Sequence, residues 1–203
     1  MTTRKVEIIV TNIVVDSYEA RSYPDDQEDA RGFIPLYQVP VYKILVKGTD
    51  TSNNNKSFEF MAPRFMPYFN NPQRPSPHYT TKGWVNAGLT SARTVIVSQY
   101  KLNYEVQNRY SPGRGAIVVK DTFYIHAGPA SLQDVGFGSA GCIEIIGNYD
   151  SFKKSIAELS GLSSGSSDTA IQQLINSRKL IVTIQAAAAP DIKNNTTRKI
   201  RLS

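Results

Sequence analysis

One cysteine and one of only two histidines lie close together in the sequence, in a pattern that could support nucleophilic catalysis. His126 ends the apolar run Phe-Tyr-Ile-His, and Cys142 follows sixteen residues later, after a glycine-rich turn and before a second apolar run. A thiol has an ordinary pKa near 8.5, and an adjacent imidazole can lower that pKa enough to form a thiolate near neutrality. The spacing therefore predicts a Cys142 nucleophile with His126 as its base.

The small residues before the cysteine suit the backbone of such a site. The segment Ser139-Ala140-Gly141-Cys142 can turn sharply, so that the N–H groups of Gly141 and Cys142 point at one position and act as oxyanion-hole donors. Ser139 is expected to shape this turn or to hydrogen-bond the histidine, although satisfying the turn's own backbone is an equal alternative. A lone cysteine is more often a small buried hydrophobe, and the ordered flanking pattern favours the catalytic interpretation.

Other cysteine and glycine motifs fit this segment less well. Caspases carry a Gln-Ala-Cys core, which is absent, and papain-like enzymes place the cysteine before the histidine. The run from Gly136 to Gly141 matches the Gly-x-Gly-x-x-Gly dinucleotide pattern, but a β-branched segment follows it where that motif requires a helix. One cysteine and two histidines cannot form a four-ligand zinc site or an internal disulfide. We therefore expect neither a metal nor another cofactor.

The elements that would position this site are mostly strands. Alternating or β-branched runs predict strands over residues 6–15, 39–46, 57–61 and 95–106, then a hairpin over 116–125 with its turn at Lys120 and Asp121. Residues 51–56 form a predicted hairpin connection, and the proline-rich residues 70–80 a long loop or lid. Two short helices are predicted late in the chain, with Asp150 and Asp168 as their N-caps, followed by a strand over 179–184.

The expected fold is therefore mainly β with two short helices. We expect a single domain of 203 residues with three parts: a β-rich part over 1–90, a catalytic core over 91–185 and a basic extension over 186–203. The formal net charge of +6 favours polyanionic surroundings, but no nucleic-acid-binding motif accompanies it. There is no apolar run long enough to span a membrane, and the N-terminal apolar stretch has the pattern of a strand instead of a signal peptide.

The segment around His126 and Ser139-x-Gly141-Cys142-Ile143 resembles the signature of the L,D-transpeptidase catalytic domain, whose members cross-link or trim bacterial peptidoglycan. The resemblance covers about twenty-five residues directly. It implies a transpeptidase-like β-sandwich or barrel, and a cysteine acyl-transfer enzyme acting on peptidoglycan stem peptides as L,D-transpeptidase, L,D-carboxypeptidase or exchange enzyme. By the same resemblance Cys142 is the nucleophile, His126 the general base and acid, and the carbonyl of Ala127 orients His126.

Three departures from that signature concern the substrate more than the chemistry. Ala140 replaces the usual second histidine, Glu144 replaces an arginine two residues after the cysteine, and the His-to-Cys spacing is slightly shorter. The variant motif that lacks the second histidine also resembles that of transpeptidase-like toxin effectors, which secretion systems deliver without a signal peptide. That analogy implies synthesis in the cytoplasm, action in the bacterial periplasm or cell wall, and an immunity or inhibitor protein as a partner.

Further candidate substrate-binding residues lie outside the motif. Glu144, Arg114 on the turn before the predicted hairpin and His78 in the proline-rich loop could contact a stem peptide, while an exposed side chain without a role is the simpler reading of His78 and Arg114. The alternative function is a non-catalytic cell-wall-binding or assembly protein that keeps the fold. Rapid alkylation of Cys142 below pH 7 is the behaviour expected of the enzyme and not of the alternative.

Overall fold

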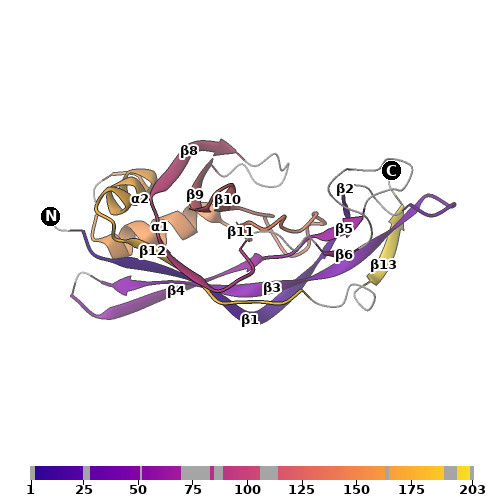
Figure 1. Ribbon diagram of the computed structural model, residues 1–203, viewed down its shortest axis with the longest axis horizontal. Coiled ribbons are helices and arrows are strands. Elements are labelled where there is room, and N and C mark those ends of the chain that lie inside the picture. Colours follow the sequence, from indigo (N-terminus) through magenta and orange to yellow (C-terminus); the bar gives the residue numbers. More distant parts are fainter. Residues whose placement is uncertain are drawn as a thin grey trace.

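Two long antiparallel strands run along most of the molecule and carry the other elements (Figure 1). The computed structural model describes residues 3–24, 28–50, 52–69, 83–84, 89–105, 114–162, 165–189 and 196–201. The strands are β1 (Val6–Ala20), β2 (Tyr23–Pro24), β3 (Phe33–Thr49), β4 (Asn55–Pro63), β5 (Pro67–Phe69), β6 (Gly83–Trp84), β7 (Arg93–Ile96), β8 (Gln99–Glu105), β9 (Arg114–Lys120), β10 (Phe123–Ala127), β11 (Ile143–Ile145), β12 (Leu180–Ile184) and β13 (Thr196–Arg201). The helices are α1 (Tyr149–Ser160) and α2 (Ser167–Asn176). The predicted mainly-β class with two helices is confirmed.

Three sheets form from these strands. The largest has the order β13-β3-β1-β12-β7, with β4 on the same edge of β3 as β13; β1 and β12 are parallel and the other pairs antiparallel. A four-stranded sheet has the order β11-β10-β9-β8, and a small third sheet joins β2, β5 and β6. The largest sheet takes strands from residues 1–90, 91–185 and 186–203, so these three stretches of chain are joined by backbone pairing.

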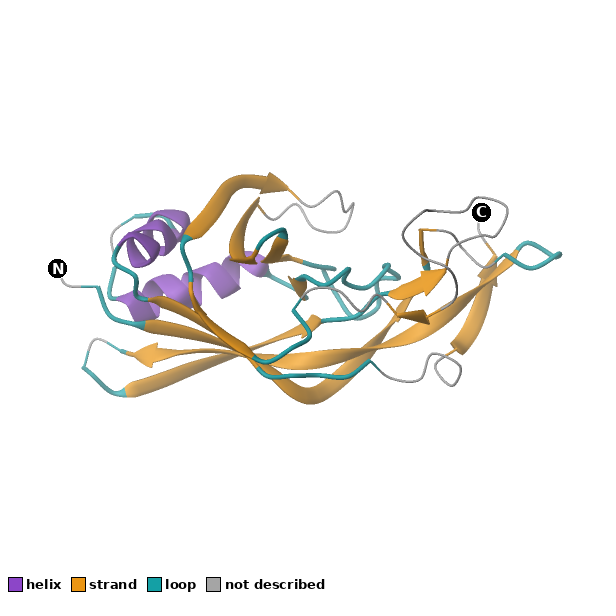
Figure 2. Cartoon of the chain, viewed as in Figure 1, coloured by secondary structure: helices purple, strands orange, loops and turns teal. Residues whose placement is uncertain are grey.

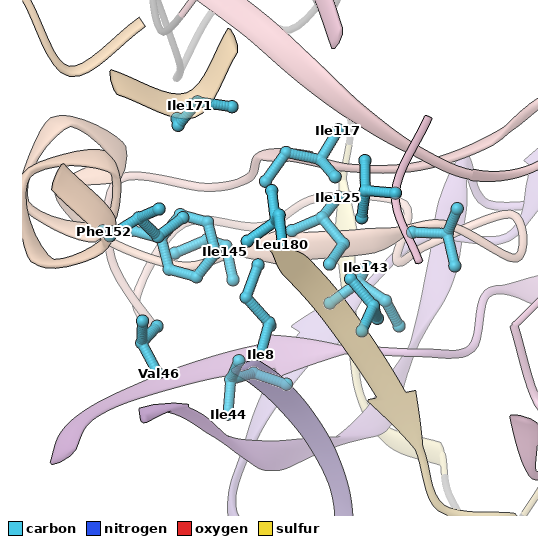
Figure 3. Packing of buried hydrophobic residues seen from close by; sticks show 14 of the residues in the cluster. Ile8, Ile44, Val46, Ile117, Ile125, Ile143, Ile145, Phe152, Ile171 and Leu180 are labelled. Atoms are coloured by element: carbon cyan, nitrogen blue, oxygen red, sulfur yellow. The ribbon is translucent and has the colours of Figure 1, made fainter. Parts of the chain in front are cut away.

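Both helices lie at one end of the molecule, beside the start of β1 (Figure 2). The main core fills the space between the large sheet, the four-stranded sheet and the helices (Figure 3). Phe152 of α1 and Ile171 of α2 meet Ile8 of the large sheet and Ile143 of the smaller one in this cluster, and all four are fully buried. Complete burial of each such side chain contributes roughly 1.5–3 kcal/mol. The core therefore holds the four-stranded sheet in place from one side.

Several predicted elements are confirmed with altered boundaries. The strands predicted over 6–15, 39–46, 57–61 and 179–184 correspond to β1, β3, β4 and β12, and the hairpin around Lys120 and Asp121 joins β9 to β10. The helix N-caps were assigned wrongly. Asn148 and Ser166 accept the capping hydrogen bonds, whereas Asp150 and Asp168 lie inside the first turns. An acid there still interacts favourably with the helix dipole, which explains why the sequence pattern suggests either position.

Two other predictions are wrong. The strand expected over 95–106 is divided into β7 and β8, which belong to different sheets, and a register shift follows Lys101 in β8. The alternation of side chains therefore does not define one face. The basic extension predicted over 186–203 is no separate part, because its residues 196–201 form β13, which pairs with β3 of the large sheet. Residues 70–80 and Thr51 lie outside the described residues.

Candidate active site

The two adjacent strands β10 and β11 bring the histidine and the cysteine to one face of the four-stranded sheet. They pair in parallel, with Ile125 opposite Ile143 and His126 opposite Glu144. Because side chains alternate along a strand, the two isoleucines point into the main core, and His126 and Glu144 point to the opposite face. Cys142 precedes β11 by one residue and shares that face. Cys142 and His126 are therefore diagonal neighbours, a spacing that aromatic side chains can bridge.

His126 is held in one orientation by its own backbone. Its side chain is 3% exposed, and Nδ1 lies 2.7 Å from the carbonyl oxygen of Ala127. Because a carbonyl only accepts, Nδ1 carries the proton and Nε2 is left as the basic nitrogen. Burial lowers the pKa of His126 below its usual 6.5, partly offset by this hydrogen bond. The histidine is therefore neutral at pH 7 and able to accept a proton.

The surroundings of Cys142 disfavour its thiolate form. Burial, opposed by a hydrogen bond at 3.4 Å from the amide of Tyr124 to Sγ and assisted by the charge of Glu144, raises the thiol pKa to about 11. Among the described residues no hydrogen bond joins Sγ to the His126 ring. The expectation of a thiolate–imidazolium pair near neutrality is therefore wrong for the free protein, since burial without a neighbouring cation penalises the thiolate.

The glycine-rich turn before Cys142 is fixed by contacts with residues 65–66. Gly138 has a φ of +78°, and a Cβ at this position would lie 2.4 Å from the carbonyl oxygen of Phe65. The next amide, of Ser139, donates to that same oxygen at 3.0 Å. The hydroxyl of Ser139 is fully buried and donates to the carbonyl of Cys142 at 2.6 Å. Ser139 therefore shapes the turn and makes no hydrogen bond to the histidine.

Two backbone N–H groups of the turn have no acceptor among the described residues. Gly141 has a φ of +94° and accepts a hydrogen bond from the amide of Leu89 through its carbonyl. Within the described part of the chain, the amides of Gly141 and Cys142 donate no hydrogen bond. Buried amides are nearly always paired in proteins, and Gly141 is buried. The described residues therefore leave both predicted oxyanion-hole donors unpaired.

A buried arginine supports the segment that holds this turn. Arg64 is 1% exposed and donates to the carbonyl oxygens of Thr11, Leu89 and Gln185, at 2.8 to 3.1 Å. Burial lowers its pKa to about 10, still well above neutrality. Its charge therefore ties β1 and the end of β12 to Leu89, whose amide binds Gly141. Nothing in the local sequence indicates this role, because the three acceptors are all backbone atoms from distant segments.

Aromatic side chains flank the histidine on the side of β8. The ring of Tyr104 lies 5.0 Å from the ring of Tyr124 and 5.6 Å from that of His126, between ring centres. Lys101 donates to the hydroxyl of Tyr124 at 2.9 Å and lies 4.8 Å from its ring centre. Tyr124 could have been found from its i, i+2 spacing to His126, but Tyr104 and Lys101 depend on the register shift in β8. These groups form one wall beside the cysteine.

The remaining predicted site residues are less informative. Arg114 begins β9 and pairs with Glu105 of β8, but its side chain lies outside the described part, as does all of His78. Ala140 is exposed. Among the described residues there is no group of three side chains suited to hold a metal ion. No described helix is long and apolar enough to cross a membrane.

No protein-family model matches the chain, and no curated protein or solved structure matches it. The likeness of residues 126–143 to the transpeptidase signature therefore remains a resemblance of sequence. The geometry of the described residues carries the functional argument instead.

Proposed function

We propose that this protein is a cysteine-dependent acyl-transfer enzyme that acts on peptidoglycan stem peptides, as an L,D-transpeptidase, an L,D-carboxypeptidase or an exchange enzyme. The observation that carries the proposal is the shared sheet face of Cys142 and His126, with the His126 Nδ1 proton bound to the Ala127 carbonyl. That arrangement leaves Nε2 as a base on the same face as the only thiol of the chain.

The proposed reaction begins with a neutral thiol and a neutral imidazole. As Sγ of Cys142 attacks the carbonyl carbon of the stem peptide, Nε2 of His126 takes the thiol proton, so no free thiolate is needed beforehand. The oxyanion that forms is held by the amides of Gly141 and Cys142. When the C–N bond breaks, His126 returns the proton to the leaving amine and a thioester remains. Water then gives a carboxylate, or an amine gives a new amide, and the thiol is restored.

Delivery to the cell wall by a secretion system, with an immunity or inhibitor protein as partner, belongs to the same proposal. It rests on the resemblance to signal-less effectors and on the net charge of +6, which suits an anionic wall.

A non-catalytic cell-wall-binding or assembly protein is the second candidate. The observation that favours it is the thiol itself, which bonds to the Tyr124 amide instead of His126 and whose pKa is raised to about 11. A cysteine that has lost its role as a nucleophile would show such a hydrogen bond and such a raised pKa. The general-base reaction above also accommodates them, because the proton leaves only as the bond to carbon forms. Slow alkylation of Cys142 below pH 7 therefore does not separate the two candidates, contrary to the expectation from sequence, and turnover has to do so.

Incubating purified tetrapeptide and pentapeptide muropeptides with the protein, followed by mass spectrometry, separates the two candidates. An enzyme gives new products with the wild-type protein and none with Cys142→Ala or His126→Gln. If the wild-type protein binds muropeptides but leaves their masses unchanged, the second candidate is correct.

A further inference from the structure

Glu144 carries a carboxyl group on the face of the candidate nucleophile, and that group has no partner among the described residues. It lies two residues after Cys142 and directly opposite His126 in the parallel register. Among the described residues, no hydrogen bond or ion pair is made by its side chain, although it is only partly exposed. The backbone around it is closely packed, because a Cβ on Gly128 would lie 2.9 Å from the carbonyl and Cβ atoms of Glu144. The carboxyl therefore has little freedom to leave this face.

The described groups on which Glu144 acts carry no positive charge. Those that its negative charge affects are Cys142, Tyr104 of β8 and Tyr18 of β1, whose pKa values it raises, and neutral His126 lies opposite. The side chain of Tyr18 is itself buried, and the backbone of Gly138 lowers the Tyr18 pKa in opposition to Glu144. Lys101, a cation of this wall, donates to the hydroxyl of Tyr124. Burial accordingly raises the pKa of Glu144 to about 8. A carboxyl in this position is stabilised by any donor that a ligand brings.

We infer that Glu144 determines the charge preference of the site, by pairing with an ammonium group that the stem peptide presents near the scissile bond. This inference rests on the proposed function. The third residue of a stem peptide carries an amine on its side chain, next to the carbonyl that the cysteine would attack. An ammonium group there stabilises the ionised form of Glu144, whereas a carboxylate there would keep Glu144 protonated and could form no ion pair with it. The preferred donor therefore carries a free side-chain amine.

Two synthetic tetrapeptides that differ only at the side-chain amine measure the contribution of that amine to binding. One is L-Ala-γ-D-Glu-L-Lys-D-Ala, and the other is the same peptide with the lysine side chain acetylated, so that only the ammonium is removed. Binding of each is measured calorimetrically to the full-length Cys142→Ala protein, which cannot turn them over. We expect the lysine peptide to bind about tenfold more tightly, as for a charge-assisted hydrogen bond. Adding Glu144→Gln should reduce the preference to less than twofold, while the exposed Glu158→Gln should leave it unchanged.

The inference is overturned if the two peptides bind equally, if neither binds, or if Glu144→Gln keeps the tenfold preference. The first two outcomes do not depend on any Glu144 variant folding. Turnover of the lysine peptide by wild-type protein is measured in parallel. Tighter binding of the lysine peptide without turnover would support the role of Glu144 and contradict the proposed enzymatic activity. Turnover without a binding preference would support the enzymatic activity and contradict the role of Glu144.

Discussion

The two faces of the β10–β11 pair differ more than any other neighbouring parts of the site. One face carries Ile125, Ile143 and Ile145, which are fully buried in the main core. The other carries His126, Cys142 and Glu144, and among the described residues neither Nε2 of His126 nor the Glu144 carboxyl has a hydrogen-bond partner. The same two strands thus join a face that supplies stability to a face that supplies chemistry. Packing on the core face positions the strands, so the polar side chains on the other face are held in place without using their polar groups in structural hydrogen bonds.

The largest effect expected on the polar face is the pH dependence of alkylation at Cys142. With a pKa of about 11, only about one thiol in 10⁴ is ionised at pH 7, so reaction with iodoacetamide should be slow there and rise about tenfold per pH unit up to pH 11. The rate is followed by mass spectrometry, and this chain has no other cysteine to interfere.

Glu144→Gln should shift this profile to lower pH, because the charge of Glu144 raises the thiol pKa. Glu158→Gln is the matched control and should leave the profile in place. Rapid alkylation at pH 7 that does not change with pH would show that the thiol is already ionised and that the assigned environment is wrong.

The core face should respond to truncation in stability. Ile143→Ala removes a fully buried side chain and is expected to lower the free energy of unfolding by about 3 kcal/mol. Cys142→Ala, one residue earlier on the opposite face, should cost less than about 1 kcal/mol, because the thiol is partly exposed. Urea unfolding measures both. Equal losses would mean that Cys142 is a packing residue, as most lone cysteines are.

Substitutions in the glycine-rich turn between β10 and β11 should have a smaller effect on stability, and a second glycine of the same turn serves as the control. Gly138→Ala forces a side chain onto the Phe65 carbonyl at a positive φ and should cost about 1–3 kcal/mol. Gly136→Ala, two residues earlier, meets the Tyr18 side chain at 3.4 Å and Pro129 at 3.9 Å, which are ordinary contacts, and should be nearly neutral. Thermal unfolding of the two variants compares them. Tolerance of both would mean that the turn is not held by residue 65.

The face carrying the chemistry could be predicted from sequence because its signals are local. His126, the glycine-rich turn and Cys142 lie within seventeen residues, and the hairpin before them has clear turn residues at Lys120 and Asp121. The helix faces were equally accessible, since Phe152, Ile156 and Leu159 follow the helical period and are buried. These features depend on short-range geometry that neighbouring residues fix.

What could not be predicted depends on contacts between distant segments. The division of residues 95–106 into β7 and β8 follows from pairing with β12 in one sheet and β9 in another. Arg64 is buried against three backbone carbonyls that no side-chain pattern reveals. The protonated thiol was also unforeseen, because burial decides its pKa and burial is a property of the whole fold.

The muropeptide digestion tests the central claim most directly. Wild-type protein is incubated with tetrapeptide and pentapeptide muropeptides, beside Cys142→Ala protein shown by urea unfolding to be folded. The proposed reaction predicts a loss or exchange of the terminal D-residue with the wild-type protein only, and a thioester-linked mass on Cys142 in rapidly quenched samples. Unchanged muropeptides with the wild-type protein, or identical products with Cys142→Ala, would contradict it.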